Sequence, residues 1–443
     1  MHYRRHRTDP ISIISAEPSL TAEKHPVAPG GNQVMFYSLT RATTWNIAGY
    51  LYLIIASLIS TPILVHSLGV TQFAQYGLII ATLVLVSSFD LGLPQAVVRS
   101  LAREYKSFTK RQTIWATSSL LFAMTGLLSG VVATGIISRF NHTPELLLTT
   151  FALVLLASLV GHYSTLPQAE GHFGYFNAKT FIVGTGNTLV AAYLAFHGYG
   201  VLTILTGQLA CYFISLLVLV YFSLKFFPRP RDGRASGIVA KSLISFGVKN
   251  QVGKVVGQIQ AQYAKYLLSS VSPLSLSSYL ITTGLVQKLS GGIAQLATAI
   301  YPASARKSNI SSIRGLYYRL QMGLFLLGLL GVGIYHLIGL PFLTWWLHAP
   351  ELVTLVDQVM RVLVWYFAIL VTTPLASTIL DSHGRPEITS FFAFATTTIE
   401  IALALLMLPK YGLFAPVYAS LIAIFITTPF LLITTDRIIK VKS

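Results

Sequence analysis

A polar stripe runs along one apolar stretch in the second half of the sequence. Lys254 and Lys265 lie eleven residues apart, so on a helix they fall on nearly the same side, ~16 Å apart along the axis. The same side carries the amides of Asn250, Gln251, Gln258 and Gln262. Each lysine supplies a point charge and hydrogen-bond donors. The stripe therefore predicts a surface that binds an anion, and the cost of a lysine in hydrocarbon indicates that it lines a wet cavity.

Further ionisable groups lie inside apolar stretches. Lys288 lies near the middle of the next stretch, and we expect it and Arg361 to extend the anion-binding surface. Arg361 follows Asp357 by one helical turn, however, a spacing that is also typical of an ion pair. Asp90 and Glu400 are the carboxylates that could bind a proton or a sodium ion. For Asp90 the alternative is a bracing role at a helix end.

Three of the cations have structural alternatives. Lys265 could direct its ammonium toward the membrane surface while its stem stays in the apolar region. Lys288 lies beside two glycines and could mark a close helix contact with its charge paired. Arg41, at the predicted cytoplasmic mouth, could meet an entering anion or simply anchor the chain. Among all these residues, Lys254 is the strongest candidate for anion binding.

The composition indicates that these residues lie on membrane helices. Of the 443 residues, 53% are hydrophobic and only 10% are charged, with a mean hydropathy of +0.66, whereas about 25% of the residues in soluble domains are charged. The net charge of +17 does not indicate a nucleic-acid partner, because the cations lie between apolar stretches. The chain is therefore predicted to be an all-α polytopic membrane protein in contact with membrane lipids.

Hydropathy predicts about twelve membrane-spanning helices. They are expected near residues 42–67, 74–98, 113–138, 146–168, 178–197, 200–224, 243–269, 276–302, 315–340, 353–380, 388–408 and 412–435. Several connections are too short for an external domain. Function must therefore lie within the membrane part.

Lysine and arginine are concentrated in alternate connections. One set holds Arg103, Lys106, Lys110, Arg111, Lys225, Arg229, Arg231, Arg234, Arg306, Lys307, Arg314, Arg319, Arg437, Lys440 and Lys442. The other set holds essentially Arg139 and Lys410. By the positive-inside rule both termini are cytoplasmic.

The longest basic connection divides the chain into two similar halves. We expect a flexible basic tail at 1–36, a six-helix bundle at 37–224, a cytoplasmic linker at 225–242 and a second six-helix bundle at 243–443. An even number of spans per half makes the repeat parallel. Two such bundles would enclose a central cleft suited to alternating access.

Two sequence clusters indicate a family. Leu68-Gly69 is followed by Phe73 and Tyr76-Gly77, and Asp90-Leu91-Gly92-Leu93 is followed by Arg99. Together they resemble the polysaccharide biosynthesis family of lipid-linked oligosaccharide flippases in the multidrug/oligosaccharidyl-lipid/polysaccharide (MOP) exporter superfamily. Ala74 departs from the glycine that is usual there.

The resemblance implies a transport function in a bacterial inner membrane. The expected substrate is an undecaprenyl-pyrophosphate-linked oligosaccharide, such as an O-antigen or exopolysaccharide repeat unit. A polysaccharide polymerase and a chain-length regulator are its expected partners. No cofactor is expected, although coupling to Na⁺ or H⁺ is possible.

Three alternatives remain. A cation-coupled multidrug exporter of the same superfamily should have more acids than cations in its cleft. A lipid II flippase usually carries more than twelve spans. A membrane-embedded polysaccharide polymerase or glycosyltransferase would need a sizeable external segment. The sequence also lacks catalytic motifs: residues 247–254, GVKNQVGK, have one residue too many for a phosphate-binding loop. The chain is therefore not expected to be an enzyme.

Overall fold

The computed structural model describes residues 31–226, 234–298, 310–382 and 385–441. Its contacts divide the chain into two units, Met1–Thr44 and Trp45–Ser443, and the contacts and cavities described below lie in the second. Every secondary-structure element in the described ranges is a helix. The all-α prediction is therefore confirmed.

The first long helix is broken between the predicted spans 42–67 and 74–98. α1 (Gly31–Ser87) is broken at Gly69, whose φ of 70° and ψ of 167° are not helical. Glycine has no Cβ and adopts this conformation without strain. The helix therefore forms two apolar arms joined by a kink. A second break follows at Leu91 and Gly92, which both have positive φ, before α2 (Leu93–Arg103).

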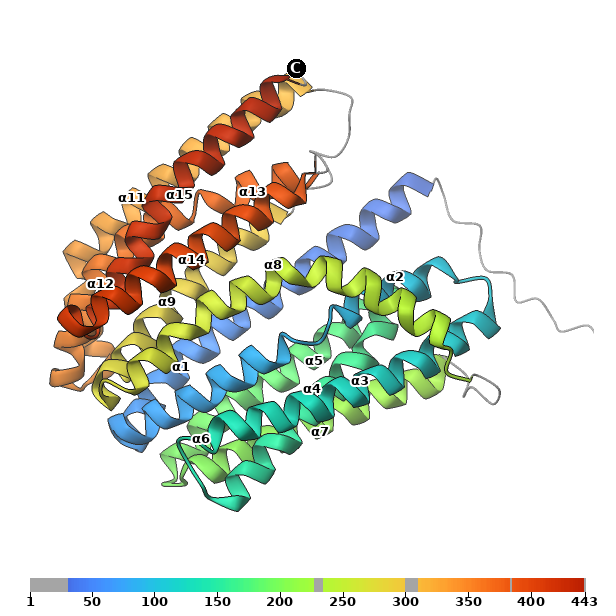
Figure 1. The fold of residues 1–443 in the computed structure, drawn as a ribbon, viewed down its shortest axis with the longest axis horizontal. Coiled ribbons are helices and arrows are strands. Elements are labelled where there is room, and N and C mark those ends of the chain that lie inside the picture. Colours follow the sequence, from blue (N-terminus) through green and yellow to red (C-terminus); the bar gives the residue numbers. More distant parts are fainter. Residues whose placement is uncertain (1–30, 227–233, 299–309, 383–384, 442–443) are drawn as a thin grey trace, which may run out of the picture. The chain divides into compact units, whose positions relative to one another are not determined.

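The remaining helices of the first half pack on one another. α3 (Phe108–Ile137), α4 (Pro144–Ala169) and α7 (Val201–Phe226) lie side by side (Figure 1). A further crossing consists of α5 (Phe173–Thr185), the π-helix η1 (Gly186–Val190) and α6 (Ala191–Phe196), all three of which contact α7. The π-helical segment η1 lines the largest cavity described below through Asn187 and Thr188.

The second half forms a similar group. Its helices are α8 (Gly237–Ser269), α9 (Pro273–Thr298), α11 (Ile310–Leu347), α12 (Pro350–Leu370), α13 (Thr373–Ser382), α14 (Pro386–Tyr411) and α15 (Phe414–Val441). α12 packs against α9, α11 and α15, while α14 packs against α8 and α15. α8 also contacts α2 and α3, so it is shared by the two groups.

Eight helical segments in the described ranges are long and apolar enough to cross a membrane. The protein is therefore a membrane protein. Each predicted span overlaps a helix, but α8, α9 and the interrupted α5–α6 crossing are not among the eight. In α8 the reason is its lysine and glutamine stripe, which lowers the hydropathy. The count of twelve spans stays a prediction.

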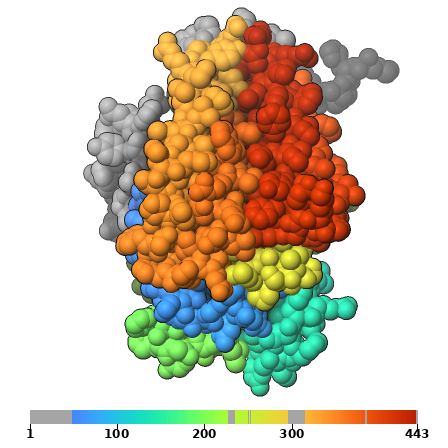
Figure 2. All heavy atoms as spheres, turned by 90° about the vertical axis from the view of Figure 1, so that its left-hand side faces the viewer, coloured from blue at the N-terminus to red at the C-terminus, as the bar shows by residue number. Residues whose placement is uncertain are grey.

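At one end the two groups are in direct contact. The Ser277 hydroxyl donates to the backbone oxygen of Val70 at 2.9 Å, and the Trp346 indole donates to that of Leu58 at 2.8 Å. Figure 2 views this end, where α1 (blue), the α8–α9 turn (yellow) and the α11–α12 region (orange) abut. The turn at Gly69 and the α8–α9 turn therefore help to close this end.

A close backbone contact joins α8 to the turn before α2. The backbone of Gly247 lies against that of Leu91 and Gly92, so close that a Cβ on either glycine would overlap backbone atoms of the other segment. The Gln251 amide donates to the backbone oxygen of Ser88 nearby. Only glycine at position 247 permits this approach.

Gly247→Ala should therefore destabilise the fold by about 1–3 kcal/mol, because backbone cannot move aside as a flexible side chain can. The apparent melting temperature in detergent measures the effect. Gly333→Ala on α11 is the matched control, since a Cβ there meets no atom within 4 Å. An unchanged melting temperature for Gly247→Ala would contradict the close contact.

Candidate functional site

Two adjoining cavities lie in the first helix group. Their volumes are about 610 and 330 Å³. They share the lining residues Ser87, Ala157, Asn187 and Tyr212. The larger is bounded by α1, α4, α5 and η1, with Lys288 contributed by α9. The smaller receives Gln208 from α7 and Gln258 from α8. Both halves of the chain thus contribute polar side chains to these two adjoining cavities, which together we call the lysine cavity.

Two lysines line the larger part of the lysine cavity. Lys288 comes from α9 and Lys179 from α5. The Lys179 ammonium lies 3.4 Å from the Ser164 hydroxyl and 5.1 Å from the centre of the Phe176 ring. Among the described residues neither lysine has a carboxylate within 4 Å. Two positive charges without an anionic partner make this region suited to an anion, because charges attract strongly in a medium of low dielectric constant.

Helix packing positions Lys288. The Tyr50 hydroxyl on α1 donates to the backbone oxygen of Lys288 at 2.6 Å. The Tyr50 ring rests on Gly291 and Gly292, where any Cβ at Gly291 would overlap the hydroxyl. The close helix contact considered for Lys288 therefore exists. Lys288 nevertheless lines the cavity, so the contact and an anion-binding role are compatible.

Sequence reasoning missed Lys179. It lies one residue inside the predicted span 178–197, where a lysine is typical of a span boundary. In the structure α5 begins earlier, at Phe173, which places Lys179 ~9 Å along the helix. The signal that could have found it is the segment before the span, FGYFNAK, whose apolar and aromatic residues are compatible with an additional helical turn.

The predicted stripe on α8 is divided among several environments. Gln258 lines the lysine cavity. Gln251, in contrast, is buried, and its side-chain amide donates a hydrogen bond to the backbone oxygen of Ser88. The Lys265 ammonium donates to the Gln262 side chain at 2.6 Å. Asn250 lies on α8 and Arg41 on α1, but both side chains are outside the described residues.

Lys254 is exposed and lies close enough to Asp90 for their charges to interact. Asp90 itself is in the turn between α1 and α2, not inside a helix as the predicted span implied. Its carboxylate accepts a hydrogen bond from the Gly92 backbone at 2.9 Å, as in the bracing alternative. Partial burial raises the pKa of Asp90, while the Gly92 hydrogen bond and the Lys254 charge act in the opposite direction.

Glu400 lies in a separate cavity of about 200 Å³ inside the second helix group. It is 3% exposed. Its carboxylate accepts from the Gln260 amide at 2.6 Å, the Ser420 hydroxyl at 2.6 Å and the Tyr263 hydroxyl at 3.1 Å. All three donors are neutral, and no described lysine, arginine or histidine forms an ion pair with Glu400. The site therefore suits a carboxylate that exchanges a proton or a small cation.

α8 is polar on two sides. On the side opposite the lysine stripe, Gln260 and Tyr263 project toward Glu400. Glu400 is 140 residues from Gln260 and 137 from Tyr263 in the sequence, so helical periodicity could not reveal the contacts. The same helix thus contributes Gln258 to the lysine cavity and Gln260 to the Glu400 cavity.

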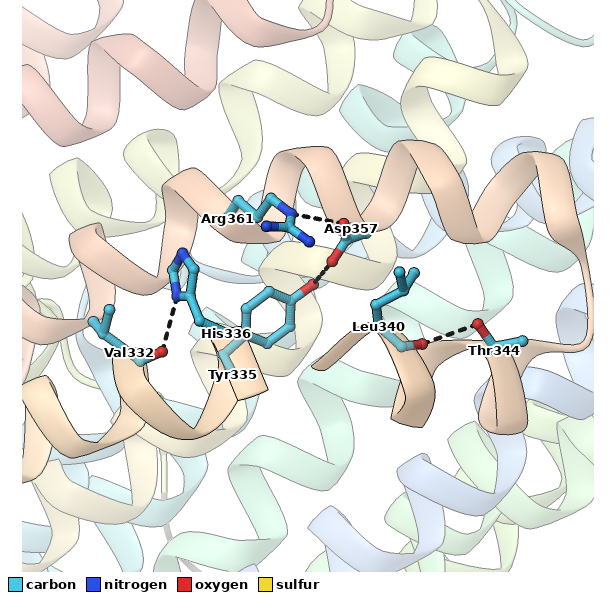
Figure 3. A network of polar contacts seen from close by, with 7 residues as sticks. All are labelled: Val332, Tyr335, His336, Leu340, Thr344, Asp357 and Arg361. Carbon is cyan, nitrogen blue, oxygen red and sulfur yellow. Dashed lines mark hydrogen bonds and ion pairs between the residues drawn. The ribbon is translucent and has the colours of Figure 1, made fainter. Parts of the chain in front are cut away.

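Arg361 belongs to a third polar cluster, between α11 and α12 (Figure 3). Its Nε donates to Asp357 at 2.8 Å, and the Tyr335 hydroxyl donates to the other carboxylate oxygen at 2.8 Å. The predicted ion pair is confirmed. Arg361 lines none of the three cavities described above, and its role in substrate binding stays a prediction. In the described part of the chain, no group of three or more His, Cys, Asp or Glu side chains could hold a metal ion.

Comparison with known families decides the classification. The model of the polysaccharide biosynthesis protein family matches residues 39–308, well over half of the chain. The chain belongs to this family. A putative O-antigen transporter of Shigella flexneri is 23% identical over 401 residues, covering 85% of this chain and 92% of that protein.

Solved structures share the fold of this family member. An inward-facing MATE family multidrug resistance transporter of the MOP superfamily superposes with a TM-score of 0.69 at 14% identity, covering 87% of this chain and 95% of that one. A MOP superfamily transporter from Pyrococcus furiosus, described as having a binding pocket of reversed polarity, gives 0.62 at 14% identity, with coverages of 90% and 95%. The predicted all-α fold is therefore one that these transporters share, while the two six-helix bundles stay a prediction.

Proposed function

We propose that this protein is a flippase that moves an undecaprenyl-pyrophosphate-linked oligosaccharide outward across the bacterial inner membrane. The observation that carries the proposal is the lysine cavity, in which Lys179 and Lys288 have no carboxylate partner among the described residues. The Shigella flexneri relative, named a putative O-antigen transporter, supports the substrate class.

The chemistry of the cavity fits the head of such a lipid. Pyrophosphate is a compact anion, and two ammonium groups in a low-dielectric region would attract it strongly. The amides of Asn187, Gln208 and Gln258 line the same region and offer hydrogen bonds to sugar hydroxyls. The polyprenyl tail would remain in the lipid while the head passes between the bundles.

The state and orientation are part of the proposal. The positive-inside rule places both termini in the cytoplasm, so the closed end seen in Figure 2 would face the outside. The structure would then be the conformation in which the lysine cavity, with Tyr50, Lys179 and Lys288, receives substrate from the cytoplasm. Alternating access would break the contacts of Ser277 and Trp346 with α1 and open that end.

The energy source is proposed to be an ion gradient acting at Glu400. Binding and release of H⁺ or Na⁺ at a buried carboxylate would favour one conformation over the other, as differential affinity requires. A polysaccharide polymerase and a chain-length regulator are proposed to act on the product outside.

Lys254→Ala tests the strongest candidate from the sequence. The residue is exposed and lies near Asp90, so its loss should not unfold the protein, whereas flipping should stop if this charge guides the head group. Surface polysaccharide in a complemented deletion strain measures the effect, with membrane insertion as the control. Normal polysaccharide would remove Lys254 from the proposed pathway.

Deleting the gene tests the function itself. Lipid-linked oligosaccharide should accumulate on the cytoplasmic leaflet of the deletion strain. Loss of its synthesis would favour an enzyme instead. Unchanged polysaccharide together with increased drug sensitivity would favour the multidrug exporter.

A further inference from the structure

A second cavity adjoins the Glu400 cavity inside the second helix group. Its volume is about 190 Å³. It shares Gln260, Tyr366 and Leu370 with the Glu400 cavity, so the two spaces are neighbours. Its lining is rich in hydroxyl groups, contributed by Thr373, Ser377, Thr389, Thr396, Thr427 and Thr428. It shares no lining residue with the lysine cavity.

The two cavities together follow α14 from its middle to its first turn. Glu400 lies ~21 Å along the axis from Pro386, the first residue of α14, and Thr389 lies ~5 Å from it. Thr389 donates to Asp381 of α13 at 2.9 Å, so an acidic group lies beside the end of the second cavity. Under the positive-inside rule this is the cytoplasmic end.

Polar contacts extend along the whole length. From the Glu400 side, Gln260 donates to the carboxylate at 2.6 Å and accepts from the Thr397 hydroxyl at 3.2 Å. Further along, the Thr396 and Thr427 hydroxyls are 2.8 Å apart. Gln260, Thr396, Thr427 and Thr389 all line the second cavity. Each of the two cavities is larger than a water molecule's share of liquid volume, about 30 Å³.

The hydroxyls present oxygen lone pairs to this space. Thr427 lines the second cavity and donates to the backbone oxygen of Ala423 in its own helix at 2.8 Å. A hydroxyl whose hydrogen is used by the helix retains acceptor capacity. Acceptor oxygens and water solvate a cation, and no lysine, arginine or histidine in the described part of the chain lines either cavity.

Among the described residues, the titratable neighbours of Glu400 are all tyrosines. Tyr263 faces it from α8, Tyr279 from α9 and Tyr366 from α12, while α15 contributes the non-titrating Ser420. Glu400 is therefore the one carboxylate among the described residues that line these two cavities. A cation entering them has a single anionic destination.

We propose that the two cavities form an access route by which the coupling cation, H⁺ or Na⁺, reaches Glu400 from the cytoplasmic end of the second helix group. The proposal rests on the coupling role of Glu400 in the proposed function. Because the route and the lysine cavity share no residue, the cation does not pass Lys179 or Lys288, whose charges would repel it. Substrate and cation thus have separate paths, and α8 contacts both through Gln258 and Gln260.

Cysteine accessibility tests the route directly. In a Cys211→Ser background, Thr389→Cys and Thr396→Cys place thiols along it, while Ala404→Cys places one on the same helix at a fully buried position that lines neither cavity. The probe is a permanently cationic, membrane-impermeant methanethiosulfonate. Labelling in inside-out vesicles should be at least about tenfold faster at positions 389 and 396 than at 404, because buried thiols react only on local opening.

The same labelling in right-side-out vesicles is the second measurement, and there the thiols at positions 389 and 396 should remain unlabelled. Equal labelling from both sides, or none in inside-out vesicles, would overturn the route. These results do not depend on flipping. If the flippase proposal is wrong but the route exists, the asymmetry persists; if only the route is wrong, transport still depends on Glu400 and the asymmetry is absent.

Substitutions that keep the side-chain volume give an independent measurement if the cysteine variants misfold. Thr396→Val with Thr427→Val removes two oxygens from the route and should slow transport driven by an imposed cation gradient several-fold. Thr→Ser at both positions should restore it. Separate H⁺ and Na⁺ gradients identify the cation. Unchanged gradient-driven transport in the double valine variant would contradict the route.

Discussion

The double variant Lys179→Ala, Lys288→Ala should transport a pyrophosphate-linked lipid at the rate of protein-free membranes. Each single change should slow transport about 10- to 100-fold, since a hydrogen bond to a charged group contributes about 1.5–3 kcal/mol. The physical reason is that the two ammonium groups are the cations lining the larger part of the lysine cavity. Flipping in proteoliposomes, measured by accessibility of the head group, gives the rate.

Lys110→Ala is the matched control, because that lysine is exposed and paired with Glu104 at 3.2 Å. It should leave transport unchanged. Lys288→Arg should retain part of the activity, since the charge remains while its geometry changes. Wild-type rates in the double alanine variant would show that the head group does not use this cavity.

Glu400→Gln should abolish the dependence of transport on an ion gradient while leaving the protein folded. The amide cannot exchange a proton or balance the charge of a cation, yet it keeps the size of the side chain. Glu400→Ala should in addition lower stability by about 1–3 kcal/mol, because the donors on Gln260, Tyr263 and Ser420 would lose their buried acceptor. Gradient-driven uptake and melting temperature separate the two effects.

Glu351→Gln supplies the control for this experiment, since Glu351 is exposed in the first turn of α12. Its uptake should equal that of the wild type. Gradient-dependent transport that persists in Glu400→Gln would place the coupling site elsewhere.

Local sequence features predicted much of the fold. Long apolar runs gave the helices, and the Leu68-Gly69 turn lies at the break in α1. The i,i+4 spacing of Asp357 and Arg361 predicted their ion pair. These features depend only on neighbouring residues and on periodicity, which a sequence displays directly.

The candidate site was only partly predictable because it depends on contacts between distant segments. Helical periodicity placed Gln258 and Gln251 on one side of α8, but it could not show that one lines a cavity and the other bonds to Ser88. Gln260 becomes important only through Glu400. Lys179 was missed because a residue at a helix boundary is ambiguous until the start of α5 is known.

The most direct measurement uses purified protein in liposomes that contain an undecaprenyl-pyrophosphate-linked oligosaccharide. Wild-type protein should move the lipid between leaflets faster than empty liposomes do, and the Lys179→Ala, Lys288→Ala variant should not. Equal rates for wild type and empty liposomes under an imposed H⁺ or Na⁺ gradient would contradict the proposed function.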